Sequence, residues 1–291
     1  MDITTLAERP ALIPRIYDID ENWPAFIPHD PVAAAYLGRV PEDFPHYCVV
    51  ATEGERVVAR GLSVPFEADV DTDADVDVDV DVDVDVDVDV DVDVDVDVDG
   101  GEELPDGGWD RVLTWAFRDR RAMRGRERHQ EHRTRKTVAG ALEITVDTAC
   151  LGRGLSSRML AALRDAVGRQ GHDTLLAPVR PTAKHLEPHV PMAEYIRRRR
   201  GDGLPADPWL RVHVRAGGTI EKVAPASMTV SGSLGQWRRW TGLPFDRDGR
   251  IEVPGALVPV HCDVAQDHAV YVEPNVWVRH RVERPGPNAN R

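Results

Sequence analysis

The sequence predicts an α/β fold carried by one domain over residues 1–291, with an acidic insertion at residues 68–100. Two stretches predict this class. Residues 47–66 place β-branched residues on both sides of the polar turn EGE, a pattern typical of a β-hairpin. Residues 137–180 pass from alternating to helical hydrophobic spacing and back, which predicts a strand, a glycine turn, a helix and a strand. A chain of 291 residues is long enough to bury a large core around these elements.

The first 45 residues predict two short helices, at residues 6–19 and 31–37. Seven prolines interrupt this region, and a proline inside a helix removes a backbone hydrogen bond and clashes with the preceding turn. Helices here are therefore limited to a few turns before the hairpin begins.

The insertion carries sixteen aspartates, one at each odd position from Asp69 to Asp99, and most of the residues between them are valine. This alternation formally matches a strand, but one of this length would span roughly 100 Å and would carry carboxylates along one face. A calcium-binding tract is the functional alternative, and it would need glycine turns and a closing glutamate, which are missing here. We therefore predict that residues 68–100 are disordered. Removing sixteen negative charges from the formal net charge of −14 leaves +2, so the total charge indicates no class of partner.

A helix is expected after the insertion, because apolar residues recur there at helical spacing: Trp109, Val112, Leu113, Ala116 and Phe117. An arginine-rich run follows and ends at Lys136. This run would suit nucleic-acid phosphates, but acidic residues interrupt it and no aromatic platform follows. We expect a solvated flank rather than a nucleic-acid site.

The cysteines and histidines predict neither a disulfide framework nor a metal site. Cys48, Cys150 and Cys262 form no CxxC pair, and the histidines form no HExxH frame. The chain has no signal-peptide pattern at its start and no apolar run of about 20 residues, the length of a membrane span. We therefore expect a cytoplasmic protein without a membrane partner.

Most of the candidate functional residues lie in the strand TVAGALEITV and the turn DTACLGRG. The alternation places Leu142, Ile144 and Val146 on one face of the strand and Glu143 and Thr145 on the other. The helix that follows the turn is expected to end near residue 170. Glycines let the backbone approach a pyrophosphate, and the positive end of the helix dipole faces the anion. The spacing is neither GxGxxG nor a P-loop.

The run VDTACLGRGLSSRMLAAL resembles the acetyl-CoA motif of the GNAT N-acetyltransferase superfamily, written Q/R-x-x-G-x-G/A after a strand. On that register Leu151 takes the Q/R position, Gly154 the first glycine and Ser156 the last small residue, so Leu151 and Ser156 depart from the pattern. The resemblance implies a mixed, V-splayed sheet flanked by helices. It also implies an acetyl-CoA site at two places, the strand (Ile144, Thr145, Val146) and the turn (Leu151, Gly152, Arg153, Gly154, Leu155, Ser156).

Acyl transfer to an amine is the activity that the resemblance implies, with a small molecule or a peptide as the acceptor. Glu143 is our candidate for the base and Tyr195 for the acid that protonates the thiolate, while His213, in a predicted strand or turn, is a further candidate for the substrate site. The alternative is a GNAT-fold module that binds acyl-CoA without catalysis. Tryptophans near the predicted strands at residues 218–225 and 268–280 favour a flat or partly apolar acceptor. The pattern names neither the acceptor nor an oligomeric state.

Replacing residues 69–99 with a short Gly-Ser linker should leave the melting temperature and the CoA affinity nearly unchanged, because a disordered acidic tract adds no packing. Scanning calorimetry and a CoA titration measure the two quantities. A large loss of either would show that the tract packs against the domain.

Overall fold

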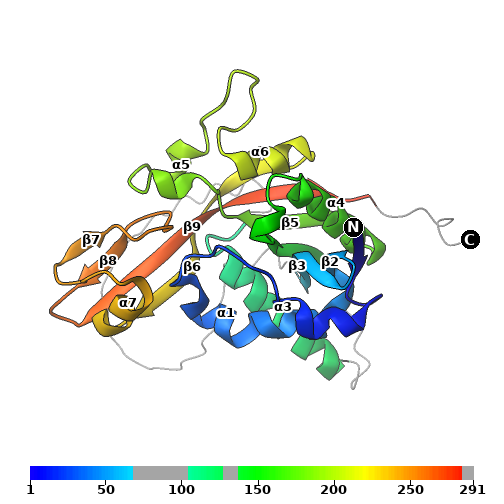
Figure 1. Cartoon of the computed structure of the whole chain (residues 1–291), viewed down its shortest axis with the longest axis horizontal. Helices are drawn as coiled ribbons and strands as arrows, with labels where there is room; N and C mark the ends of the chain where they lie inside the picture. Colours follow the sequence, from blue (N-terminus) through cyan, green and yellow to red (C-terminus); the bar gives the residue numbers. More distant parts are fainter. Residues whose placement is uncertain (68–103, 127–136, 284–291) are drawn as a thin grey trace, which may run out of the picture.

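The computed structural model describes residues 1–67, 104–126 and 137–283, so the predicted insertion and most of the arginine-rich run lie outside it. The described strands form one sheet in the order β1-β2-β3-β4-β5-β9-β8-β7, and β6 pairs with β9 beside this path (Figure 1). The strands are β1 (Asp2–Thr5), β2 (Cys48–Glu53), β3 (Arg56–Glu67), β4 (Thr137–Val146), β5 (Thr174–Val179), β6 (Thr219–Gly232), β7 (Gly249–Ile251), β8 (Val260–Asp263) and β9 (His268–Arg281).

The longer helices are α3 and α4. The described α-helices are α1 (Pro31–Tyr36), α2 (Val40–Asp43), α3 (Trp109–Arg126), α4 (Leu155–Arg169), α5 (Met192–Tyr195), α6 (Pro208–Arg215) and α7 (Leu234–Thr241). Short 3-10 turns connect them, including η1 (Pro10–Arg15) and η5 (Thr148–Cys150). No helix in these ranges is both long and apolar enough to cross a bilayer.

The sheet is splayed between β4 and β5. These two strands run parallel and pair only at Ala139 with Leu175 and at Gly140 with Leu176, whereas every other pair in the described sheet is antiparallel. Beyond Gly140 the two strands part, and both then line one cavity. The predicted mixed, V-splayed sheet flanked by helices is confirmed.

Helices cover both faces of the sheet near the splay. Helix α4 packs over β2, β3 and β4 through Met159 and Leu163. On the other face α3 packs over β3 and β4 and contacts α1, with Val112 and Leu113 in the larger core. Figure 1 shows β9 running along the molecule, from α7, β7 and β8 at one end to β5 and α4 at the other.

One face assignment on β4 is wrong. We predicted Leu142 on the same face as Ile144 and Val146, but Leu142 lies in the α3-side core and the other two pack on the α4 side. The β3–β4 register shifts between Leu62 and Ser63, and such a bulge reverses the alternation of side chains on either side of it. The Trp109 indole N–H donates to the Leu142 carbonyl at 2.8 Å and so fixes α3 against this irregular point.

The other expected elements have mixed outcomes. The hairpin is confirmed as β2 and β3, and the two carboxyl-terminal strands are confirmed within β6 and β9. The helix at residues 31–37 is confirmed as α1. The helix at residues 6–19 is wrong in extent, because only the 3-10 turn η1 forms there and its prolines, Pro10 and Pro14, block a longer helix.

Candidate functional site

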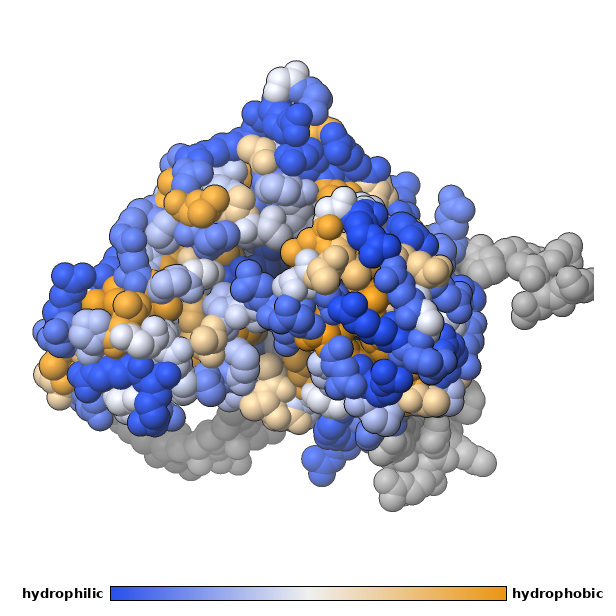
Figure 2. Space-filling model, in the orientation of Figure 1, coloured by the Kyte–Doolittle hydropathy of each residue, from blue (hydrophilic) through white to orange (hydrophobic). Residues whose placement is uncertain are grey.

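A cavity of about 1700 Å³ opens where β4 and β5 part. It exceeds the roughly 300–1,000 Å³ of most small-molecule pockets, so it has room for two substrates side by side. Its walls come from β4, β5, the start of α4, the amino-terminal segment, α6 and the inner parts of β6 and β9. Figure 2 shows the corresponding hollow near the centre of the face of the molecule in view.

The glycine turn forms one end of the cavity. Gly152 and Gly154 have φ of 76° and 69°, and Gly154 is the N-cap residue of α4. A glycine offers no capping side chain, so the first N–H groups of this 15-residue helix have no capping acceptor from a side chain within the described ranges. An added Cβ at either glycine would meet nothing within 4 Å. The turn is therefore an open cradle of donors at the positive end of a helix, and an anion fits it.

The open edge of β4 continues the cavity from this turn. One edge of the strand pairs with β3, and the other edge pairs with β5 only as far as Gly140. Ile144, Thr145 and Val146 line the cavity, and the Thr145 hydroxyl is buried without a hydrogen-bond partner among the described residues. Unpaired backbone groups on this strand edge suit the amide groups of a pantetheine arm.

Glu143 lies on the same strand and lines the cavity together with Arg60, Glu21 and Tyr17. Arg60, whose side chain is only 3% exposed, donates through Nε to the Glu143 carboxylate and through Nη2 to Glu21 at 2.6 Å. The Arg60 guanidinium also lies 4.7 Å from the centre of the Tyr17 ring. Glu143 is thus a residue of the cavity lining whose carboxylate, in a side chain only 6% exposed, balances a buried cation.

Tyr195 lies outside the residues that line the cavity. It is buried among the residues around α6, and its hydroxyl donates to Asp207 at 2.9 Å. Asp207 caps α6 by accepting from the N–H groups of Trp209 and Leu210. Burial, with the negative Asp207 beside it, raises the pKa of Tyr195. This position ties α5 to α6 and gives no support to Tyr195 as the acid in thiolate protonation.

Arg153 also lies outside the cavity lining, whereas His213 belongs to it. The Arg153 side chain is half exposed and pairs with Glu53 at 2.6 Å, so any phosphate contact by this side chain stays a prediction. His213 is in α6, not in the strand or turn that we predicted, and its ring contacts His280 at 2.9 Å. Burial lowers the pKa of His213 to about 3, so the ring is neutral at pH 7. The remaining predicted site residues all line the cavity: Glu143, Ile144, Thr145, Val146, Leu151, Gly152, Gly154, Leu155 and Ser156.

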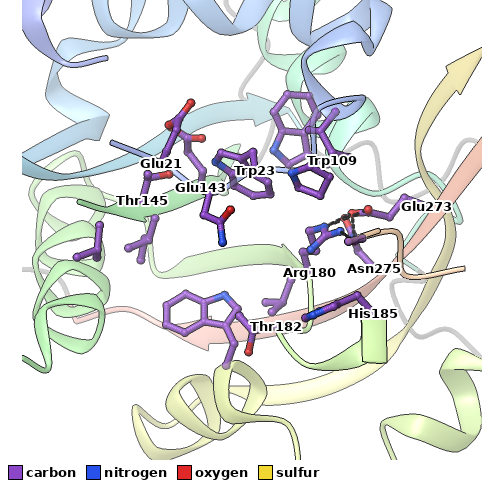
Figure 3. Close-up of a pocket in the computed structure, with 18 of the residues that line it drawn as sticks. Glu21, Trp23, Trp109, Glu143, Thr145, Arg180, Thr182, His185, Glu273 and Asn275 are labelled. Atoms are coloured by element: carbon purple, nitrogen blue, oxygen red, sulfur yellow. Dashed lines mark hydrogen bonds and ion pairs between the residues drawn. The ribbon is translucent and has the colours of Figure 1, made fainter. Parts of the chain in front are cut away.

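A second polar group lines the far side of the cavity, and the sequence analysis did not predict it. Arg180 follows β5 and donates from Nε to both oxygens of Glu273, at 3.1 and 3.0 Å, and from Nη2 to the Gly255 carbonyl at 2.6 Å. Glu273 is fully buried and also accepts from the Tyr271 hydroxyl and from the Asn275 side chain. Figure 3 shows Arg180, Glu273 and Asn275 grouped apart from Glu21, Glu143 and Thr145.

Carboxylates outnumber cations among the described residues that line the cavity. Four glutamates lie there with two arginines, and each arginine is already paired with a glutamate: Glu21, Glu143, Glu252, Glu273, Arg60 and Arg180. The carboxylates of this lining exceed its arginines by two, which favours a cationic occupant. In the described ranges, no three His, Cys, Asp or Glu side chains lie together as a metal would require.

Comparison with known proteins gives one strong sequence relative. No family model matches the chain. The arginine N-acetyltransferase avaD of Aspergillus versicolor is 31% identical, over 96% of this chain and 93% of its own. A GNAT-like decarboxylase, GphF, solved with isobutyryl-CoA, shares the fold at 14% identity, with a TM-score of 0.51 over 97% of this chain and 99% of its own. The loading GNATL domain of CurA from Lyngbya majuscula gives 14% identity and a TM-score of 0.48, over 96% of both chains.

Gly154→Asp should weaken CoA binding by a few kcal/mol, because a carboxylate in the cradle repels phosphate and a Cβ occupies the space it needs. Gly171→Asp is a matched control: Gly171 follows the other end of α4, has φ of 87° and likewise has open space around an added Cβ. Titration calorimetry with CoA compares the two folded variants. Equal affinity in both would remove the turn from the site.

Proposed function

Because the chain belongs to the GNAT superfamily of N-acetyltransferases, we propose that it transfers an acetyl group from acetyl-CoA to a small cationic amine of the arginine class. Acyl transfer from acyl-CoA to an amine is the reaction of the enzyme; the acetyl group and the acceptor class are the proposal. The observation that carries it is one continuous cavity that joins the glycine turn, the open edge of β4 and a set of carboxylates.

The donor would lie along the first two of these features. The pyrophosphate fits the N–H groups that follow Gly152 and Gly154, where the helix dipole and free donors favour an anion. The pantetheine arm fits the open edge at Ile144, Thr145 and Val146, where the strand has no β5 partner. When it is bound, the thioester supplies the acyl group.

The acceptor side suits a cation with a partly flat body. The carboxylates that line the cavity favour a positively charged amine or guanidine. Four tryptophans also line it, which gives flat apolar walls against which such a molecule can pack: Trp23, Trp109, Trp209 and Trp240. The relative named as an arginine N-acetyltransferase supports the same acceptor class.

Glu143 is the proposed base. An alkylamine with a pKa of about 10.4 is almost wholly protonated at pH 7, and only its neutral form attacks a thioester. Glu143 lies on the strand that would carry the pantetheine arm, and it belongs to the residues that line the cavity. When Glu143 takes the proton, Arg60 keeps Glu21 as its partner, so the buried guanidinium is not left without a counter-charge.

A panel of acceptors tests the function directly. The protein is incubated with acetyl-CoA and arginine, agmatine, an arylalkylamine or an aminoglycoside, and released thiol is followed. We expect release that depends on arginine or a close relative of it. Tight CoA binding without turnover on any amine would instead favour the non-catalytic module, and release with only uncharged arylamines would contradict a cationic acceptor.

Glu143→Gln should lower kcat by about 10²-fold while leaving CoA affinity intact, and the deficit should shrink as rising pH deprotonates the amine unaided. Glu221→Gln is a matched control, because Glu221 on β6 pairs with Arg279 on β9 at 3.1 Å but lies outside the cavity lining. A pH series of kcat for both variants measures this effect. The same kcat as wild type across the series would remove Glu143 from the mechanism.

A further inference from the structure

We propose that Arg180 orients the acceptor by donating to a carbonyl-type oxygen, either the carboxylate of an amino acid or the carbonyl of a peptide. The inference rests on the proposed function and adds to it a contact with an oxygen of the acceptor. Some guanidinium N–H groups of Arg180 form hydrogen bonds within the protein, and others remain for a ligand in the cavity. The proposal follows from this difference.

The guanidinium of Arg180 is held along one side only. Its Nε and Nη2 are engaged by Glu273 and by the Gly255 carbonyl, whereas Nη1 makes no hydrogen bond to any described residue. Nη1 is also not among the buried side-chain atoms that lack a hydrogen-bond partner, because in the described chain those atoms belong to other residues. The side chain is 17% exposed and lines the cavity, so its free donors are available to a ligand there.

Glu273 positions Arg180 and is not itself free to bind the acceptor. Its two oxygens already accept from Arg180, from Tyr271 at 2.7 Å and from Asn275 at 3.0 Å. Asn275 is fixed in turn by the Ser227 hydroxyl at 2.5 Å. Such a fully satisfied buried network is rigid, and it holds the guanidinium in one orientation.

The free donors of Arg180 match an oxygen ligand in chemistry and in place. A guanidinium presents planar N–H groups that suit carboxylate and carbonyl oxygens, and the ring of Trp23 stands 5.9 Å from its central carbon. Glu21 and Glu143 belong to the other polar group of the cavity (Figure 3). A molecule that carries both a cationic nitrogen and a carbonyl oxygen would satisfy both groups at once.

Three acceptors that share a guanidine separate the possibilities: arginine has a carboxylate, arginine amide has a neutral carbonyl, and agmatine has neither. In the wild type we expect kcat/KM for arginine, arginine amide or both to exceed that for agmatine by about tenfold or more. Arg180→Met should bring this ratio close to one and change kcat/KM for agmatine less than threefold. Comparing kcat/KM for arginine with kcat/KM for arginine amide shows whether a carboxylate or a neutral carbonyl oxygen is preferred.

The variant set keeps the result independent of folding. Arg180→Met leaves Glu273 buried without its cation, so the double variant Arg180→Met/Glu273→Gln is measured beside it, with melting temperature and CoA affinity as checks. Arg198→Met is the control, because this half-exposed arginine pairs with Glu187 away from the cavity lining. A wild-type selectivity that persists in the folded double variant would overturn the role of Arg180, as would a wild type without selectivity. A wild type inactive on all three guanidines would overturn the proposed function itself.

Discussion

The limited pairing between β4 and β5 is the constraint on which the site depends. Two residue pairs join the strands, and everything beyond Gly140 is free to diverge. Helix α3 packs so closely at this point that a Cβ on Gly140 would collide with Val112 and Phe66. The β3–β4 bulge lies next to it and bends the strand away. A continuous parallel ladder would close the cavity and pair the strand edge that now faces it.

The features that the sequence predicted are those encoded by neighbouring residues. Gly152 and Gly154 identified the turn, since φ > 0 before a helix is a local demand that glycine meets without strain. Where local patterns compete, prediction failed. We predicted a strand or turn at His213, but Asp207 caps the first turn and Pro208 fits it, so a helix forms. The bulge that moved Leu142 to the other face has no local signature.

The charged pairs of the cavity could not be predicted, because they join residues far apart in the chain. Arg60 and Glu143 are 83 residues apart, and Arg180 and Glu273 are 93 apart. From the sequence alone, each arginine would be predicted to be a solvated surface residue. Within the fold, however, each is mostly buried, and burying a charge is costly unless a partner and further hydrogen bonds compensate for it. Both pairs meet that condition at the cavity wall, where a charge can also meet a ligand.

The two sides of the cavity therefore differ in how the chain builds them. The side proposed for the acyl donor comes from one continuous stretch, residues 141–157, which contains the open strand edge and the glycine turn. The acceptor side is assembled from side chains of separate segments near residues 21–24, 180–185, 252–255 and 273–275. Backbone groups tolerate sequence change, whereas a wall of side chains changes with each substitution. A fold built this way can keep one acyl donor while its acceptor varies. For this reason the donor motif could be predicted from the sequence, whereas the acceptor side could be described only from the structure.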